Sequence, residues 1–241
     1  TYIARRLLQS VVVLLGVTLL SFLTLHLAGD PTYLYVSERA SEEEIIQTRQ
    51  LLGFDRPLPV QYLDFLGRLV QGDLGNSLRA RKPALGLVLE RLPATLELTL
   101  FAMILSTLLA IPIGIISATK RGTPLDGGIM LLAMFGQSVP GFWLGIMLIL
   151  SVGLGLRWLP ISGHTPVFQP ALSGDIGTAV ANIPDAILHL IMPGITVGVF
   201  SLSRNARLVR SSMLEVLSQD YIQTARSKGL TERRVILRHA F

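Results

Sequence analysis

The residues of this sequence that could perform chemistry are few and scattered. The four histidines, His26, His164, His189 and His239, show neither an HExxH arrangement nor any other metal-ligand spacing. There is no cysteine, so disulfides and thiolate–metal sites are excluded. Neither a GxxxxGK phosphate loop nor a nucleophile elbow occurs. We therefore expect no catalytic residue, no metal site and no ATP hydrolysis in this chain.

The long apolar runs of the chain carry almost no ionisable side chains. Glu97 and His189 fall near the ends of such runs, and the third run offers only Gln137 and Ser138. Ion-coupled transporters bury paired carboxylates or histidines because such groups carry the coupling charge. An ion-coupled secondary transporter is therefore disfavoured, and so the energy for any transport would come from elsewhere.

One basic segment near the C-terminus has a pattern of its own. Residues 203–217 are expected to form a helix that leaves the membrane, with Asp220 as the N-cap of a short helix over 221–228. Gly229 would follow as a C′ residue with positive φ, and Thr231 would cap the next helix, with Glu232 in its first turn. The pattern alone leaves two readings open, a solvated loop and a docking element.

The composition indicates the elements that carry these residues. Half of the residues are hydrophobic, 15% are charged, and the mean hydropathy is +0.55, which is typical of an integral membrane protein. The net charge of +5 clusters at the ends of apolar runs, as positive-inside topology requires, rather than on one face suited to nucleic acid. We predict an all-α membrane protein.

Three regions are expected along the chain. Residues 1–30 would hold a cytoplasmic end and the first span, and residues 31–94 an extracytoplasmic insert. Residues 95–241 would form a core with spans at about 95–118, 126–156 and 186–202. The core would also contain a loop at 157–185 and a cytoplasmic segment at 203–241. The third span would be tilted or broken near 138–141. Its Gly141 and Gly145 form a GxxxG pair suited to close helix contact.

The insert 31–94 is expected to hold three short helices. Ser41 with Glu44 predicts a capping box, and the helix that it starts would end at Gly53. An amphipathic helix follows Pro59, and a third would run from Pro83 to Glu90. The insert could be a packed surface subdomain or a contact site for an external partner.

Basic residues also predict the orientation. Arg5 and Arg6, Lys120 and Arg121, and the 204–238 segment lie on one side if four spans alternate. The N-terminus is therefore expected in the cytoplasm, and the two inserts outside.

The segment 221–229 resembles the cytoplasmic loop of ABC importer permeases, Glu-Ala-Ala, three residues, Gly. Gln223, Thr224 and Ala225 take the leading positions and Gly229 the glycine, although the Glu is absent. The chain is similar to the peptide/nickel branch, B-type subunit, at three further stretches: 72–77 (GDLGNS), 91–97 (RLPATLE) and 159–163 (LPISG).

The resemblance implies a permease in the inner membrane of a prokaryote. Six spans are expected in a type I importer permease, so this chain would lack the last two and end inside the coupling segment. The partners would be a homologous second permease, two ATPase subunits and an extracytoplasmic binding protein. ATP and Mg would be bound by the ATPase subunits, and no cofactor by this chain. The implied coupling residues are Asp220, Tyr221, Thr224, Ala225, Arg226, Lys228, Gly229 and Leu230.

The resemblance does not fix the transported solute. Dipeptides, oligopeptides, nickel and glutathione all remain open, because specificity largely rests with the binding protein. A non-transporting membrane scaffold is the alternative of a different class, beside the secondary transporter already disfavoured.

Overall fold

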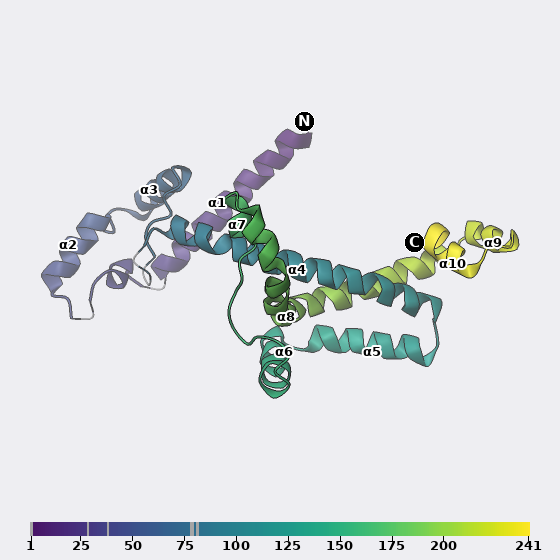
Figure 1. The fold of residues 1–241 in the computed structure, drawn as a ribbon. Helices are drawn as coiled ribbons and strands as arrows, with labels where there is room; N and C mark the ends of the chain where they lie inside the picture. The colour runs from purple at the N-terminus through teal and green to yellow at the C-terminus, as the bar shows by residue number, and fades with distance from the viewer. Residues whose placement is uncertain (1, 28, 38, 78–79, 81) are drawn as a thin grey trace. The chain divides into compact units, whose positions relative to one another are not determined.

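The computed structural model describes residues 2–27, 29–37, 39–77, 80 and 82–241. Figure 1 shows a helical chain, as the sequence predicts; within the described ranges the only extended pairing is an isolated bridge between Asn76 and Pro83. The elements are α1 (Tyr2–Leu27), η1 (Pro31–Leu34), α2 (Glu42–Leu52), α3 (Leu58–Val70), α4 (Ala84–Thr119), α5 (Pro124–Ser138), α6 (Gly141–Leu148), η2 (Ile149–Gly155), α7 (Phe168–Leu172), α8 (Ile176–Leu217), α9 (Asp220–Ser227), α10 (Glu232–Arg234) and η3 (Val235–Ala240). They form two compact units, Thr1–Glu90 and Arg91–Phe241.

Three helices, α1, α4 and α8, are long and apolar enough to cross a membrane. α5 and the α6–η2 helix form a bent pair that counts as a fourth span if it crosses. The bend is 104°, which confirms the predicted break near 138–141. Its cause is local, because Pro140 disfavours helical backbone at Val139, whose φ and ψ are −75° and 125°.

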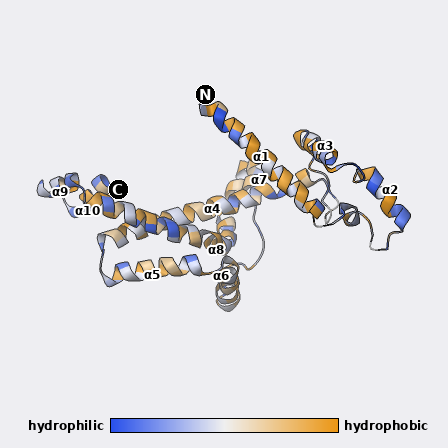
Figure 2. Ribbon diagram, turned by 180° about the vertical axis from the view of Figure 1, so that it is seen from behind, coloured by the Kyte–Doolittle hydropathy of each residue, from blue (hydrophilic) through white to orange (hydrophobic). Residues whose placement is uncertain are grey.

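The first unit is organised around α1. Figure 2 shows α1 hydrophobic along most of its ribbon, and Phe22 is its one buried residue. The predicted capping box is present: Ser41 and Glu44 exchange hydrogen bonds at the start of α2. Gly53 ends α2 with a φ of 72°, which confirms the predicted helix end.

Two predicted boundaries are wrong, both because prolines are accommodated inside helices. The insert helix expected over 83–90 and the span expected from Thr95 are one helix, α4, which continues through Pro93. The loop expected over 157–185 is interrupted by α7 and ends where α8 begins. α8 then continues through Pro184 and Pro193 to Leu217, so no boundary separates the fourth span from residues 203–217.

The core of the second unit depends on glycines where α4, α5 and α8 meet. A Cβ atom on Gly114 would lie 2.8 Å from the Ala206 carbonyl oxygen, and one on Gly194 would lie 2.6 Å from the Phe101 ring. Gly136 faces Ser203 on α8 as closely. These small residues let helix backbones approach, as is typical of membrane bundles. The Gly141/Gly145 pair is not the site of closest packing, since added Cβ atoms there would meet Thr196 only at 3.8 and 3.4 Å.

Candidate functional site

The predicted coupling segment folds as a short helix fixed to the rest of its unit. Ile222 and Ala225 on one face of α9 are buried, with exposed fractions of 0% and 7%. They join a hydrophobic cluster with Ala118 from α4, Met213 from α8, and Val235 and Ala240 from η3. Figure 1 shows α9 and α10 beside the C-terminal end of α8. α9 is therefore packed directly against α8.

The opposite face of α9 is polar and accessible. Tyr221, Thr224 and Lys228 are exposed there, while Leu230 is half-buried against the cluster. Gly229 follows the helix with a φ of 77°, which confirms the predicted left-handed residue. No heavy atom beyond its chain neighbours lies within 4 Å of the position that its Cβ would take. The glycine is thus required by backbone conformation and not by crowding.

A salt bridge connects α9 to the helix that follows it. The Arg226 guanidinium donates to both carboxylate oxygens of Glu232, at 2.6 and 3.1 Å. Hydrogen bonding to Arg226 lowers the pKa of Glu232, and the same bond raises the pKa of Arg226. The bridge thus spans the turn at Gly229, and both of its side chains are exposed.

The structure modifies the expected roles of three coupling residues. Asp220 lies in the first turn of α9, and Gln219 is the N-cap, so the capping prediction is wrong by one residue. Asp220 still places a negative charge at the helix N-terminus. Ala225 packs inside this chain instead of lying open to a partner. Arg226 is engaged with Glu232, whereas Tyr221 and Thr224 on α9 and Lys228 at its C-cap have exposed side chains that could contact a partner.

A buried polar cluster lies between α4, α5 and α8 near the same end of α8. The Asp126 carboxylate accepts two hydrogen bonds from Arg210, both at 2.8 Å, one from the Ser117 hydroxyl at 2.6 Å and one from the Gly122 amide at 3.1 Å. Its side chain is 8% exposed. Nearby on the same helices, Arg207 donates to Gln137. This ion pair joins the start of the predicted third span to the predicted cytoplasmic segment, so it lies at the span ends and not within the apolar runs.

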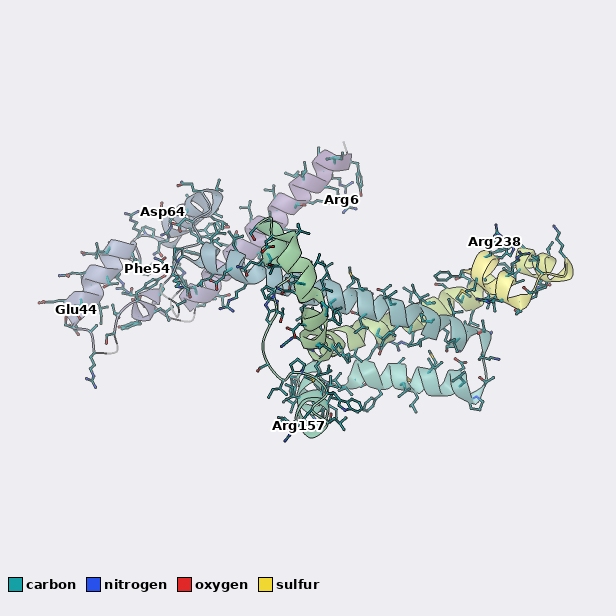
Figure 3. All side chains as sticks on the ribbon, in the orientation of Figure 1. Arg6, Glu44, Phe54, Asp64, Arg157 and Arg238 are labelled. Carbon is teal, nitrogen blue, oxygen red and sulfur yellow. The ribbon has the colours of Figure 1, made fainter. Side chains whose placement is uncertain are left out.

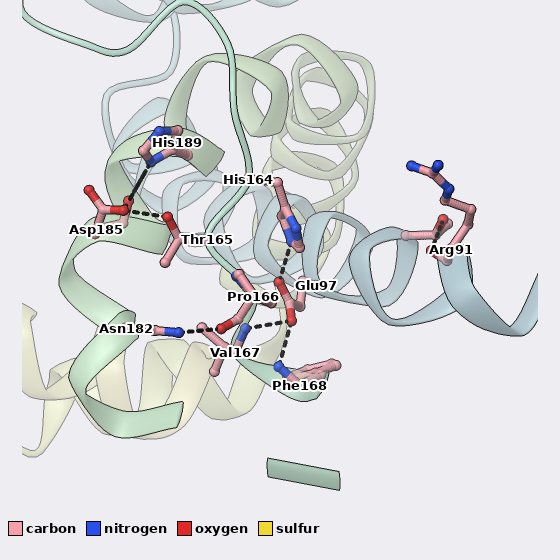
Figure 4. Close-up of polar contacts among 11 residues, drawn as sticks. Arg91, Glu97, His164, Thr165, Pro166, Val167, Phe168, Asn182, Asp185 and His189 are labelled. Atoms are coloured by element: carbon pink, nitrogen blue, oxygen red, sulfur yellow. Dashed lines mark hydrogen bonds and ion pairs between the residues drawn. The ribbon is translucent and has the colours of Figure 1, made fainter. Parts of the chain in front are cut away.

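A second polar cluster holds the loop before α7. Figure 4 shows the Glu97 carboxylate accepting from the amides of Val167 and Phe168, at 2.9 and 2.5 Å. Its other oxygen lies 2.8 Å from the ring nitrogen Nε2 of His164. From the other side, α8 holds the loop, because Asn182 donates to the Pro166 carbonyl at 2.7 Å and Asp185 accepts from Thr165. The loop is thus fixed to both α4 and α8.

Neither cluster could be found from local patterns. Asp126 and Arg210 are 84 positions apart, and Glu97 and Val167 are 70 apart. The sequence contains one signal for the second cluster. Glu97 is the last residue of RLPATLE, a stretch similar to permeases, and the loop 164–168 begins just after LPISG, another such stretch. Within the described residues no group of three or more His, Asp or Glu side chains could hold a metal ion.

These features define a class: a helical, multi-pass membrane protein whose polar clusters fix helices and loops. Comparison with known families identifies the class further. The family described as binding-protein-dependent transport system inner membrane component matches residues 110–241. The family of the N-terminal part of such membrane components matches residues 1–99. The chain belongs to this family of inner-membrane permeases.

Individual relatives match along the whole chain. The chain is 39% identical to the di/tripeptide transport system permease protein DppB of Pseudomonas aeruginosa, over 100% of this chain and 74% of the relative. It is 42% identical to the dipeptide transport system permease protein DppB of Escherichia coli K12, over 99% and 74%. It is 39% identical to the oligopeptide transport system permease protein AppB of Bacillus subtilis, over 99% and 73%.

Proposed function

We propose that this chain is a permease subunit of an ATP-driven importer of di- or oligopeptides. The relatives are named as dipeptide, di/tripeptide and oligopeptide permeases, which favours peptides over nickel, glutathione or another small solute. The chain would form half of the path across the membrane together with a homologous second permease. An extracytoplasmic binding protein would deliver the peptide, and two ATPase subunits would bind ATP and Mg.

The observation that carries this proposal is the placement of α9. Its buried face is fixed to α4 and α8, and its exposed face offers an aromatic ring and a cation to a partner. This arrangement suits a helix that docks on an ATPase subunit and passes its movement into the spans. Residues 220–231 would be the coupling segment. Ile222 and Ala225 would anchor α9, while Tyr221, Thr224 and Lys228 would contact the ATPase.

α8 extends the coupling path to the other cluster. It is one uninterrupted helix of 42 residues, with Met213 in the α9 cluster and Asn182 and Asp185 at the loop held by Glu97. A shift of α9 would thus reach the loop 164–168 through a single element. In this proposal ATP-driven closure of the ATPases changes the position of that loop at the outer end of the path.

The experiment uses the full-length permease in the complete transporter in proteoliposomes. Tyr221→Ala with Lys228→Glu removes the exposed contacts of α9 and leaves its buried face intact. We expect ATPase association to weaken roughly tenfold or more, as for truncated interfacial aromatic anchors. Peptide-stimulated ATP hydrolysis should fall in parallel while the abundance of the permease in the membrane stays normal.

A matched control substitutes Gln169 by Ala on α7, where the side chain is also exposed. Wild-type ATP hydrolysis in the α9 variant would contradict the coupling role. ATP-dependent uptake of nickel or glutathione but not of peptides would contradict the substrate. Uptake driven by an ion gradient without ATP would indicate a secondary transporter, and absence of any flux with all partners present would indicate a scaffold.

A further inference from the structure

α3 presents three different faces around its axis. The first face carries Gln61, Tyr62 and Phe65 and packs against α1. The second carries charges, with Asp64 paired to Arg56 at 3.0 Å and Arg68 one turn later. The third is an apolar stripe at i, i+4, i+7 and i+11, formed by Pro59, Leu63, Leu66 and Val70.

Three of the four stripe residues are exposed, and Leu66 is half-buried. Leu63 is 66% exposed and Val70 is 88% exposed, and Pro59, in the first turn of α3, is exposed as well. Single exposed apolar residues are common on soluble surfaces, but a periodic stripe beside a charged face is typical of helices at a membrane interface. We therefore expect this apolar face of α3 to be shielded from water by another apolar surface.

The attachment of α3 to α1 indicates its depth. The Tyr62 hydroxyl donates to the Leu15 carbonyl at 3.1 Å and lies 3.0 Å from the Thr18 hydroxyl. Gln61 reaches His26 at 2.9 Å, near the end of α1. The Phe65 ring lies 6.1 Å from the ring of Phe22, one turn further in. α3 therefore contacts α1 from its C-terminal end to its middle.

The middle of α1 lies at the centre of a membrane span. At about 1.5 Å per residue, Leu15 and Thr18 lie roughly 12–17 Å from Leu7, where the apolar run of α1 begins. The hydrocarbon core is about 30 Å thick, so Tyr62 bonds near its midplane. The neighbouring residues of α1, among them Val12, Leu14 and Leu20, expose their apolar side chains at this level. Both α3 and the middle of α1 therefore carry exposed apolar side chains.

We propose that α3 is inserted in the outer half of the bilayer, beside α1, with its apolar stripe against lipid acyl chains. Within the hydrocarbon core every polar group needs a hydrogen-bond partner. The polar atoms of α3 that face α1 have such partners. The Gln61 amide nitrogen donates to the carbonyls of Phe54 and Arg56, at 3.2 and 2.7 Å, and its oxygen faces His26. On the charged face, Asp64 (labelled in Figure 3) is paired with Arg56 at 3.0 Å.

This inference concerns the insert 31–94 and is independent of what the permease transports. The insert was expected to be a surface subdomain, but in this proposal α3 is a membrane anchor that fixes the angle of α1. An anchor of this kind holds the outer end of α1 at a defined depth while other helices move.

The absence of native cysteine allows single labelled positions in the full-length permease within its complete transporter. Leu63→Cys and Val70→Cys carry the fluorophore NBD on the apolar stripe, and Arg68→Cys carries it on the charged face of the same helix. The complexes are placed in phosphatidylcholine vesicles. Quenching is measured with doxyl-labelled phosphatidylcholine, which acts from the acyl chains, and with iodide, which acts from water.

We expect doxyl lipid to quench positions 63 and 70 at least about threefold more than position 68, and iodide to show the opposite order. Iodide quenching at 63 and 70 equal to that at 68 would place the stripe in water and overturn the proposal. Weak quenching by both agents would mean that a protein partner covers the stripe, which overturns it equally. Two stripe positions keep the test decisive if one variant fails to assemble.

Discussion

At the scale of single residues, Asp126 holds several elements together. Its carboxylate joins the end of α4, the turn after it and α8 through four hydrogen bonds. A buried carboxylate is stable only with such partners, and its guanidinium partner depends on it in turn. The pair therefore fixes the part of α8 that carries α9, three residues before the cluster residue Met213.

The prediction at this scale is a thermodynamic coupling between Asp126 and Arg210. Asp126→Asn and Arg210→Gln should each lower the melting temperature of the purified permease by several degrees, because each leaves a buried polar partner incompletely bonded. The double variant should lose less than the sum of the two single losses. Strictly additive losses would mean that the two side chains act independently, contrary to the geometry.

At the scale of elements, the turn at Gly229 sets the direction in which the chain leaves α9. With a φ of 77° and open space around its Cβ position, this residue tolerates a side chain only if the side chain accepts left-handed backbone. Gly229→Val should therefore cost roughly 1–2 kcal/mol locally. We expect the Arg226–Glu232 bridge to loosen and peptide-stimulated ATP hydrolysis to fall several-fold, with normal abundance of the permease in the membrane.

The matched control is Gly229→Asn, because asparagine adopts the left-handed region at little cost. Near wild-type hydrolysis is expected for this variant. An equal loss of ATP hydrolysis in both variants would show that any side chain at position 229 is harmful, whatever backbone conformation it adopts. Equal activity in valine, asparagine and wild type would mean that the turn has no part in coupling.

The elements also show how far the sequence alone could predict the fold. The capping box at Ser41, the ends at Gly53 and Gly229 and the break before Pro140 depend on residues within one turn, so local chemistry was sufficient. Pro93 and Pro184 gave the same local signal as Pro140 but lie inside continuous helices. Whether a proline ends a helix depends on the neighbours that satisfy the freed backbone groups, and these are distant in sequence.

The candidate site divides in the same way. The coupling segment was predicted from contiguous residues, whereas Arg210, which pairs with Asp126, and the loop residues that bond Glu97 are distant in sequence and had no local signal. The intrachain burial of Ala225 was missed because its neighbours, Met213 and Ala118, become adjacent only when α4 and α8 pack.

At the scale of the whole molecule, the contacts of α4 indicate whether the bent pair α5–η2 crosses the membrane. Glu97 and Ser117 on α4 are 20 positions apart, which is about 30 Å of helix and so about the thickness of the hydrocarbon core. Ser117 contacts the beginning of α5 through Asp126, whereas Glu97 contacts the loop that follows η2. The chain from the start of α5 to the loop residues 164–168 therefore runs from the level of Ser117 back to the level of Glu97, as a crossing requires.

Combined with the basic residues at one side, this arrangement predicts the topology of the permease. Single cysteines at Ser77 and Ser173 should react with an impermeant maleimide in intact cells, because both precede a span that begins outside. A cysteine at Ser227, exposed on α9, should react only after the membrane is permeabilised. Four crossings place positions 173 and 227 on opposite sides, whereas a re-entrant α5–η2 would reverse both relative to Ser77. Labelling of position 227 from outside would therefore refute the crossing of the bent pair together with the cytoplasmic docking of α9, and the permeabilised sample controls for a buried or unreactive thiol.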